Sequence, residues 1–382
     1  MTTNDASNSG SIATGDVDVV VVGGGIAGLV ATTRLIDAGL TCVVLESRDR
    51  VGGRLLTHDT AAGRFDLGAT WFWPGEQRVE ALIDELGVAT HGQHLAGDAM
   101  YHVAAGAQRI AGNPIDVASG RFSNGAASLA ERLAASLGDA VQLQARVHRI
   151  EHDQPELRVH YAGGSLTARH VVLALPPSLA VHQIEFRPVL PDPLQRLAAA
   201  TPVWMGNVAK AVAVYPSAFW RSDGLAGAAI SHLGPLREVH DMSGPDGAPA
   251  ALFGFAPLAP GVPTPTEDEI VAQLVELFGP QAATPTEVLV KDWRADSHTV
   301  PPVIAAGTAM STYAHPLYQQ PAGNGRIHWA STETAPVAPG HIEGAIAAAE
   351  RAIAPIIGTP TRLATRSPGS SLHIRYGRRH GR

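Results

Sequence analysis

The sequence predicts an α/β protein in which a Rossmann-like dinucleotide-binding domain is interleaved with a second domain, mainly β-sheet with some helices. Three features carry this prediction. A strand, a glycine cluster, a helix and a second strand follow one another near the start; strand-like segments and an amphipathic helix fill the middle; and a helix closes the pattern. The length of 382 residues, of which 45% are hydrophobic and 16% charged, suffices for two intertwined domains.

The opening βαβ unit is predicted from a continuous run of signals. Residues 17–22 (VDVVVV) are almost all β-branched, as in a strand covered on both faces. Apolar residues at helical spacing predict a helix over 26–38, Gly39 ends it, and residues 41–46 form a second strand. This order of elements is typical of a nucleotide-binding fold.

Three glycines in GxGxxG spacing join the first strand to the helix. Gly23 permits a tight turn, Gly25 lets the backbone approach a pyrophosphate, and Gly28 lets the helix and strand pack closely. The helix N-terminus then faces the phosphate charge. Glu46 follows about twenty residues on, where a carboxylate accepts hydrogen bonds from ribose hydroxyls. Because glycines also close ordinary turns, only the complete order of elements makes this prediction specific.

The middle of the chain indicates a second sheet. Strands are expected there over residues 203–215, 226–232, 250–256 and 287–293, whereas a strand over 170–175 is expected to belong to the dinucleotide-binding domain. A helix over 267–278 places Ile270, Leu274 and Leu277 on one apolar stripe. Two proline-rich stretches are expected to be crossings or loops, residues 176–193 and 257–265.

Lys210 is singled out by period-two alternation in NVAKAVAVY. It shares one face of the expected strand with Val212 and Val214, whereas alanines occupy the other face. An ammonium directed at a core face costs free energy unless something pairs with it, so such lysines are uncommon and often functional. The alternative is a lysine whose head reaches water at a strand end.

The last helix is expected to begin near His341. Pro336, Pro339 and Gly340 interrupt the chain immediately before an apolar pattern at helical spacing that starts at Ile342. The positive end of this helix is therefore available to a ligand with negative charge.

Charge and cysteine content exclude several classes of protein. The net charge of −7 gives no global attraction to nucleic acid or to an anionic membrane, and a small-molecule partner fits better. The single cysteine, Cys42, cannot form an intrachain disulfide, and no Cys/His spacing suggests a metal site. We therefore expect a cytoplasmic protein with no metal, and no window long and apolar enough to cross a bilayer is present.

The two ends of the chain differ from its middle. Residues 1–16 are rich in small polar residues and are expected to form a disordered leader rather than a secretory signal. Residues 358–382 contain no acid and accumulate arginines among Ser, Gly and Pro. We expect a basic flexible tail there, with a nucleic-acid- or lipid-binding arm as the alternative.

Six segments, in the same order along the chain, together resemble the flavin monoamine oxidase family of the FAD-dependent amine oxidase superfamily. They span residues 17 to 355 and read VVVVGGGIAGLVATTRL, VLESRDRVGGR, FDLGATWFWPG, VVLALPP, GNVAKAVAVY and WASTETAPVAPGHIEGAIAAAERA. The resemblance implies FAD as the cofactor, oxidation of an amine to an imine, and reoxidation of the flavin by oxygen. It also implies a Rossmann-like FAD-binding domain with an interleaved substrate domain.

The resemblance carries over to individual residues. Lys210 matches the family lysine that holds a water against flavin N5, Trp293 matches a tryptophan near the flavin, and Glu333 would act on the polar linkage of the cofactor. Arg54 would lie near the flavin or the pyrophosphate. The expected catalytic residues are Lys210, Trp293 and His341, and the expected cofactor-binding residues are Gly23, Gly25, Ile26, Ala27, Gly28, Glu46, Arg48, Arg54, Gly68, Ala69, Thr70, Val147, Glu333 and Ile342.

The sequence departs from the family pattern around the substrate. Residues 294–306 lack the cysteine that carries covalent FAD in some members, so we expect noncovalent FAD. His341 stands where many members have a tyrosine, and its charge varies near neutral pH. The stretch between Gly87 and residue 122 is far shorter than in the family, where a helical lobe is inserted. His298 replaces a glycine-rich run and is expected to be a solvated loop residue rather than a base.

These features lead to a domain division and to a function. The FAD-binding domain is expected over residues 17–75, 121–180 and 320–357, and the substrate domain over 76–120 and 181–319. The leading hypothesis is hydride transfer from an amine to flavin N5, with O₂ as acceptor and H₂O₂ as product. A desaturase- or protoporphyrinogen-oxidase-like enzyme acting on carbon–carbon bonds, and a flavin-binding protein without turnover, are the alternatives; the oligomeric state is left open.

Overall fold

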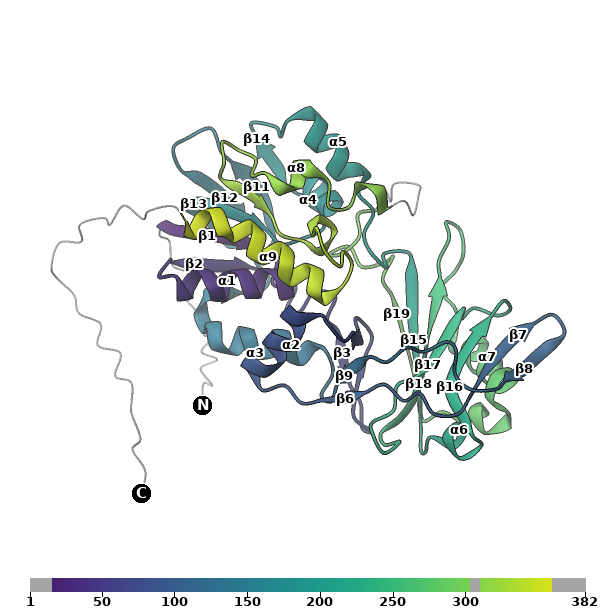
Figure 1. Ribbon diagram of the computed structural model, residues 1–382. Helices are drawn as coiled ribbons and strands as arrows, with labels where there is room; N and C mark the ends of the chain where they lie inside the picture. Colours follow the sequence, from purple (N-terminus) through teal and green to yellow (C-terminus); the bar gives the residue numbers. More distant parts are fainter. Residues whose placement is uncertain (1–15, 303–309, 359–382) are drawn as a thin grey trace, which may run out of the picture.

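Two β-sheets, each with its own hydrophobic core, organise the chain (Figure 1). The computed structural model describes residues 16–302 and 310–358. The first sheet carries the helices from both ends of the described chain, and the second sheet is built from its middle. Of the expected leader, residues 1–15 lie outside the described residues. Of the expected basic tail, residues 359–382 lie outside them.

The first sheet contains the opening βαβ unit. Its central strands β2, β1, β13 and β20 are parallel. Val19–Val22 of β1 pair with β2 on one side and with β13 on the other, and β13 also pairs with β20. In order across the sheet the strands are β10 (Val141–Gln142), β2 (Cys42–Leu45), β1 (Asp16–Val22), β13 (Gly164–Leu173), β12 (Leu157–Tyr161), β11 (Val147–Glu151) and β14 (Glu185–Arg187), with β20 (Ile327–Trp329) also paired to β13. Complete burial of Val19–Val21 explains their β-branched composition.

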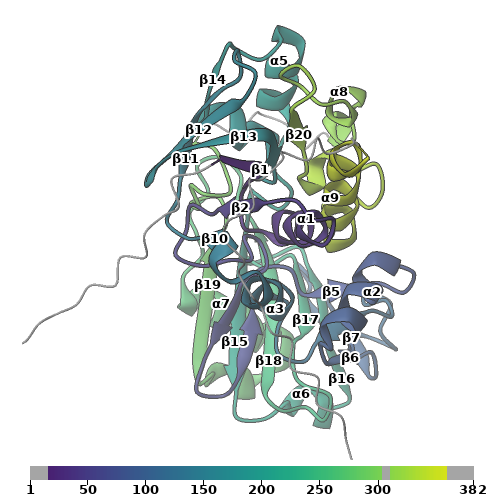
Figure 2. The ribbon, with the colours of Figure 1, turned by 90° about the vertical axis from the view of Figure 1, so that its left-hand side faces the viewer.

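Helices cover both faces of this sheet. On one face α1 (Ile26–Asp37) and α9 (Ile342–Ile357) lie side by side, as Figure 2 shows, and pack in one core with α2 (Gln77–Leu86) and α3 (Ala127–Leu137). On the other face a second core joins the sheet to α4 (Pro177–Gln183) and α5 (Asp192–Ala200). The sequence-predicted strand, helix and strand of the opening unit are thus confirmed, as is the helix that begins after His341.

The second sheet has the strand order β19 (Glu287–Asp292), β15 (Val208–Tyr215), β18 (Ala250–Pro257), β17 (Glu238–Asp241), β16 (Leu225–Ser231), β7 (Asp98–Val103) and β8 (Gly106–Ile110). The alanines of β15 face α7 (Glu267–Phe278), whereas Val212 and Val214 face Phe65 and Phe253 on the opposite side. The alternation read from the sequence is therefore real. Thr266 caps α7 together with Glu269, as a capping box.

Smaller elements lie between these strands and helices along the chain. They are the hairpin β3 (Thr57–Asp59) and β4 (Arg64–Asp66), the three-stranded sheet of β5 (Trp71–Phe72), β9 (Gly120–Phe122) and β6 (Thr90–Gly92), the short helices α6 (Phe219–Ser222) and α8 (Pro316–Gln319), and the 3₁₀ turns η1 (Gly138–Ala140), η2 (Pro280–Ala283), η3 (Met310–Thr312) and η4 (Thr332–Thr334). The segment between β4 and β5 lies against the cavity described below.

Two expectations about the middle of the chain were wrong. The proline-rich residues 176–193 are not a loop, because they contain α4, β14 and the start of α5. Prolines occupy the first positions of both helices, where a fixed φ and a missing N–H suit a helix start. The strand expected from residue 203 begins only at Val208, and residues 203–207 form a turn.

The domain boundaries remain a proposal, with two changes. Strand β14 pairs in parallel with β11, and α2 packs in the core under α1 and α9. Both segments were assigned to the substrate domain by the sequence, yet they belong to the first sheet and its cores. The short stretch after Gly87 adds β7 and β8 to the second sheet, and β6 and β9 to the three-stranded sheet.

Two features are absent from the part of the chain that is described. Within residues 16–302 and 310–358, no helix is both long and apolar enough to span a bilayer. The same residues contain no cluster of three or more His, Cys, Asp or Glu side chains placed to hold a metal ion.

Gly28 provides a test of the close packing between α1 and β1. A Cβ atom at Gly28 would lie 2.0 Å from the carbonyl oxygen of Gly23 and 3.2 Å from Cβ of Ala174. We expect Gly28→Ala to lower the free energy of unfolding by roughly 1–3 kcal/mol, because the backbone must shift to relieve overpacking. Urea denaturation measures this change.

Gly92→Ala is the matched control, because nothing lies within 4 Å of a Cβ built at Gly92. This variant should stay within roughly 1 kcal/mol of the wild type. Equal stabilities for the two variants would contradict close packing at Gly28.

Candidate active site

A cavity of ≈ 570 Å³ lies between the two sheets. It is lined by Gly23, Glu46, Ala174 and Ser331, the residues that follow or nearly follow the ends of β1, β2, β13 and β20. Parallel strands end at one edge of a sheet, so the topology gathers these residues from distant parts of the chain. Every site residue expected from the sequence lines the cavity except Gly28 and Glu333. Gly28 lies behind it, in the packing of α1.

The glycine loop forms one end of the cavity. Gly25 is the N-cap of α1 and no side chain caps this helix, so the first N–H groups of Ile26 and Ala27 face the cavity that they line. The loop is held from behind, because the Gly24 N–H donates to Glu46 at 2.7 Å and the Gly52 N–H donates to Gly24 at 2.8 Å. An uncapped helix start is a site for anions.

Glu46 and Arg48 lie beside this loop. The buried Glu46 carboxylate also accepts from the Arg48 N–H at 2.9 Å, which directs the carboxylate toward the cavity wall. The Arg48 guanidinium turns toward the second domain, where it donates to Asp296 and Thr299, each at 2.7 Å. Arg48 thus fastens the segment after β19 over the cavity.

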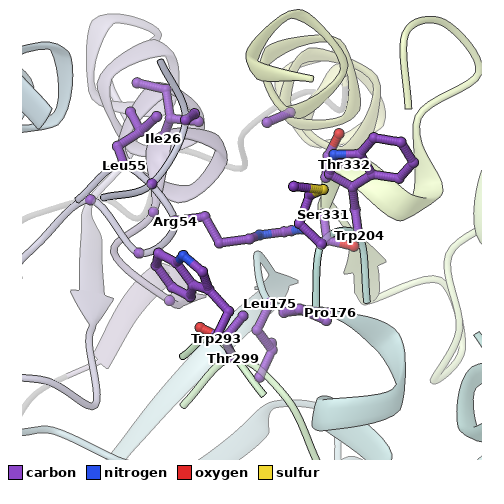
Figure 3. A pocket seen from close by; sticks show the side chains of 18 of the residues that line it. Ile26, Arg54, Leu55, Leu175, Pro176, Trp204, Trp293, Thr299, Ser331 and Thr332 are labelled. Atoms are coloured by element: carbon purple, nitrogen blue, oxygen red, sulfur yellow. The ribbon is translucent and has the colours of Figure 1, made fainter. Parts of the chain in front are cut away.

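Arg54 and Glu333 form a buried ion pair. The guanidinium donates to the two carboxylate oxygens at 2.7 and 3.1 Å, and Glu333 is completely buried. Burial opposes the charge of Arg54, but the ion pair outweighs it and raises the pKa of Arg54. Glu333 does not reach the cavity; Arg54 does, and Figure 3 shows its side chain extending toward Ser331 with Trp293 beside it.

Lys210 projects from β15 to the floor of the cavity. Its side chain is 2% exposed, and its ammonium donates to the Gly68 carbonyl at 2.9 Å and to the Thr70 hydroxyl. The Phe253 ring centroid lies 4.3 Å from Nζ. Burial lowers the pKa of Lys210 to about 7, with Asp66 opposing and Arg121 adding to the shift. An ammonium has three donors, so one remains for a ligand.

Asp66 is a second buried ionisable group near Lys210. Its carboxylate accepts from the Thr57 hydroxyl at 2.6 Å and from the Ala126 N–H at 2.9 Å, at the start of α3. Burial raises the pKa of Asp66, although Lys210 acts in the opposite direction. The segment 66–70 therefore contains both the carboxylate and the acceptors that surround the lysine.

Tryptophans form the walls next to Lys210. Trp293 lines the cavity, and its indole N–H donates to the Leu67 carbonyl at 2.9 Å. Trp71 donates to Gln93 at 2.9 Å and packs against Phe253. Trp71 and Trp73 line the cavity, whereas Phe72 packs against Phe122.

His341 forms a stacked pair at the start of α9. Its ring lies 4.6 Å from that of Trp73, at an interplanar angle of 30°, and its Nδ1 lies 2.7 Å from a Glu76 oxygen. No side chain caps α9, so the helix start at Ile342 also opens into the cavity. The site therefore has two uncapped helix starts, from α1 and α9.

Sequence reasoning missed part of the lining. Among the missed residues are Trp204, Met205, Arg237, Glu238 and Phe255. Phe255 and Glu238 could have been found by counting register from Lys210, once the order β15, β18 and β17 is known. Trp204 lies in a turn against Gly340, where a Cβ would come within 2.8 Å of the indole, and no sequence signal indicates this contact.

His298 differs from its expectation as a solvated loop residue. It lines the cavity, and its Nδ1 lies 3.0 Å from the Ser47 hydroxyl. The adjacent ion pair between Arg48 and Asp296 holds this loop against the nucleotide-binding side.

The parallel sheet and the uncapped start of α1 are typical of a dinucleotide-binding protein, and a buried lysine lies in the same cavity. Comparison with protein families identifies the dinucleotide. Residues 98–357 match the model described as flavin containing amine oxidoreductase, and residues 21–86 match an NAD(P)-binding Rossmann-like domain. The chain belongs to the flavin-containing amine oxidoreductase family and is an FAD-dependent oxidoreductase of the amine oxidase type.

Known relatives cover most of the chain. AofH of Mycobacterium tuberculosis, whose name assigns it to the flavin-containing monoamine oxidases, is 28% identical over 443 aligned positions, which cover 89% of this chain and 96% of the relative. Human flavin-containing amine oxidase B is 26% identical, with 89% and 86% covered. An alignment longer than the 382 residues of this chain means that the relative carries segments absent here.

Solved structures share the fold. Wild-type putrescine oxidase bound to putrescine superposes with a TM-score of 0.79 at 23% identity, covering 90% of this chain and 99% of that chain. Cyclohexylamine oxidase from Brevibacterium oxydans gives a TM-score of 0.78 at 25% identity, with 90% and 99% covered. The expected fold class, a Rossmann-like FAD-binding domain with an interleaved, mainly β-sheet second domain, is confirmed.

The buried ammonium of Lys210 makes the stability of the protein depend on pH. The unfolded chain holds this proton up to about pH 10.5, but the folded protein holds it only to about pH 7. Lys210 therefore destabilises the folded state most at and below pH 7, and the penalty fades by roughly 1.4 kcal/mol per pH unit as pH rises toward 10. We expect the stability advantage of Lys210→Met over the wild type to shrink across that range in urea denaturation.

Lys291→Met is the matched control for this measurement. Lys291 lies on the neighbouring strand β19 and pairs with Asp296 at 2.8 Å. The difference in the free energy of unfolding between Lys291→Met and the wild type should not change with pH in the way expected for Lys210→Met. Parallel pH profiles for Lys210→Met and the wild type would show that the buried lysine keeps an ordinary pKa.

Proposed function

We propose that the protein oxidises the CH–NH group of a small amine to an imine by hydride transfer to N5 of FAD. Molecular oxygen is the proposed acceptor for the two electrons, with hydrogen peroxide as the product. The observation that carries this proposal is Lys210, a buried lysine with a pKa of about 7 and one free donor, in a cavity that two uncapped helix starts enter. Membership of the amine oxidoreductase family supports the reaction type.

The residues of the cavity fit a noncovalent FAD. The start of α1 at Ile26 and Ala27 would bind the pyrophosphate, Glu46 would accept from the ribose hydroxyls, and Arg54 would face the polar linkage. The chain's single cysteine, Cys42, lies in β2 and does not line the cavity, and burial raises the pKa of its thiol to about 12. The cavity therefore has no cysteine that could form a thioether to the cofactor.

The start of α9 would favour the reduced cofactor. FAD, when bound, would supply the hydride acceptor, whose reduced form carries negative charge. The uncapped N–H groups at Ile342 present a fixed positive potential, which is strongest where water is excluded. Because Arg54 is neutralised by Glu333, this helix start supplies the preorganised dipole without a second unpaired cation.

Lys210 would act on protons and water. Two of its donors are used by Gly68 and Thr70, so the third would hold a water at the cavity floor. A pKa of about 7 lets the side chain exchange a proton near neutral pH, as imine hydrolysis and oxygen reduction require. Thr70 and Gly68 act as positioning residues for the ammonium.

The stacked rings of Trp73 and His341 would orient the amine. An aromatic face attracts a nitrogen-bearing group and excludes water, and the Glu76 carboxylate fixes the orientation of the histidine ring. The amine must lose its proton before hydride transfer, because an ammonium nitrogen cannot donate electron density to the breaking C–H bond. Trp73, His341 and Glu76 are therefore proposed to contact or orient the substrate rather than the cofactor.

The pH dependence of flavin reduction tests this function. The purified protein should be yellow, release its flavin on acid precipitation, and be bleached anaerobically by a suitable amine in stopped flow. The rate of bleaching should rise about tenfold per pH unit between pH 6 and 9, until the reactive amine is neutral. Admission of oxygen should restore the colour and release one peroxide per imine.

Three other results would point elsewhere. A rate that stays flat across pH 6 to 9 contradicts the mechanism. Bleaching by polyenes or porphyrin-type rings but not by amines indicates the desaturase-like alternative. Bound FAD that no amine or amino acid bleaches indicates a flavin-binding protein without turnover.

A further inference from the structure

A row of side chains crosses the second sheet beneath the cavity. Lys210 of β15 pairs with Phe255 of β18, and Phe255 pairs with Glu238 of β17, in antiparallel register. Residues directly opposite one another point to the same face of a sheet, so all three side chains share one face. Neighbouring strands are about 4.8 Å apart, which separates the backbones at Lys210 and Glu238 by roughly 10 Å.

Glu238 presents a carboxylate to the cavity. Its side chain lines the cavity and is 53% exposed, and its one ion-pair partner among the described residues is His240, at 3.6 Å. Phe255 also lines the cavity and is half-buried. An apolar ring therefore separates the proposed reaction centre at Lys210 from an open carboxylate farther along the same face.

The charges around Glu238 leave it negative. His240, two residues along the strand, lies 2.6 Å from Asp116 and 3.6 Å from Glu238. Burial alone would lower the pKa of His240, but the two carboxylates raise it; in turn His240 lowers the pKa of Glu238. One imidazolium between two carboxylates leaves one net negative charge, and Glu238 is the member of the group that is exposed to the cavity.

Arg237 is the other charged group at this wall. It precedes β17, is exposed and lines the cavity, and its backbone N–H donates to Phe255 at 2.9 Å. Its guanidinium lies outside the row because side chains alternate along a strand. A ligand that follows the row from Lys210 over Phe255 meets the carboxylate rather than the guanidinium.

We propose that Glu238 binds the distal cation of the substrate, so that the preferred substrates are amines with a second ammonium group at the far end of an alkyl chain. This inference rests on the proposed function and names its substrate class. The reactive nitrogen lies above Lys210, the alkyl chain packs on Phe255, and the distal ammonium pairs with Glu238. A simple alkylamine of equal length brings no second cation to this carboxylate.

Steady-state kinetics of the holoenzyme tests the inference. The probes are α,ω-diaminoalkanes of three to six carbons and the n-alkylamines of equal length. The wild type should show a kcat/KM about tenfold or more higher for the best diamine, with an optimum length and a KM that rises with added NaCl. Glu238→Gln should lower kcat/KM for that diamine by roughly tenfold to a hundredfold, mainly through KM, and leave the n-alkylamine within about twofold.

Two further variants isolate the charge. Glu287→Gln removes a carboxylate from β19 of the same sheet, outside the cavity, and should leave the diamine preference and its salt dependence unchanged. Arg237→Gln should raise the diamine preference or leave it unchanged, because it removes a like charge from the wall. Equal effects of Glu238→Gln on diamine and alkylamine, or no effect on either, would overturn the inference.

Equilibrium binding separates this inference from the proposed function. Calorimetric titration of the oxidised holoenzyme with 1,4-diaminobutane under anaerobic conditions requires no turnover. If no amine bleaches the flavin, tighter binding of the diamine than of butylamine, lost in Glu238→Gln, still supports the Glu238 subsite. Binding that does not distinguish the two ligands in the wild type contradicts it.

Discussion

The hydrogen bonds from Lys210 to Gly68 and Thr70 are the interaction on which the arrangement of the site depends. Lys210 belongs to the second sheet, whereas residues 66–70 continue from the hairpin that follows the glycine loop. A buried ammonium without acceptors would be too costly to keep, so the lysine requires that the two parts of the chain meet at this point. Trp293, which donates to the Leu67 carbonyl, closes the same junction from the other side. Lys210, Gly68, Thr70 and Trp293 all line the cavity, so these contacts join the two parts of the chain at its wall.

The junction also explains why the site accepts unfavourable burial. Lys210 is nearly inaccessible, its neighbour Asp66 is buried, and each helps the other to remain charged. A methionine would fill the same volume without a desolvation penalty, so stability alone does not account for a lysine here. Local conflicts of this kind are expected where function and not packing selects the residue. The ion pair of Arg54 with Glu333 is the opposite case, since it neutralises a cation that the cavity would otherwise hold unpaired.

The cofactor side could be predicted from sequence because its signals are local. The strand, the three glycines, α1 and Glu46 lie within about thirty consecutive residues, and each position has a conformational or chemical reason. The alternation around Lys210 predicted its burial for the same reason. The helix start at His341 was likewise marked by neighbouring prolines and glycine. In contrast, the proline-rich residues 176–193 misled the prediction, because proline begins a helix as readily as it ends one.

The substrate side could not be predicted, because its residues meet only through tertiary pairing. Glu238 and Phe255 reach the cavity through the register of three strands that are distant in sequence, and Trp204 reaches it through a turn that contacts Gly340. A shift of one residue in any of these pairings would turn Glu238 away from the cavity. The opposite wall combines the backbone of the glycine loop with Glu46 and Arg54, residues that belong to short sequence motifs. The pairing of β15, β18 and β17, and not any local motif, therefore determines which side chains form this wall of the cavity.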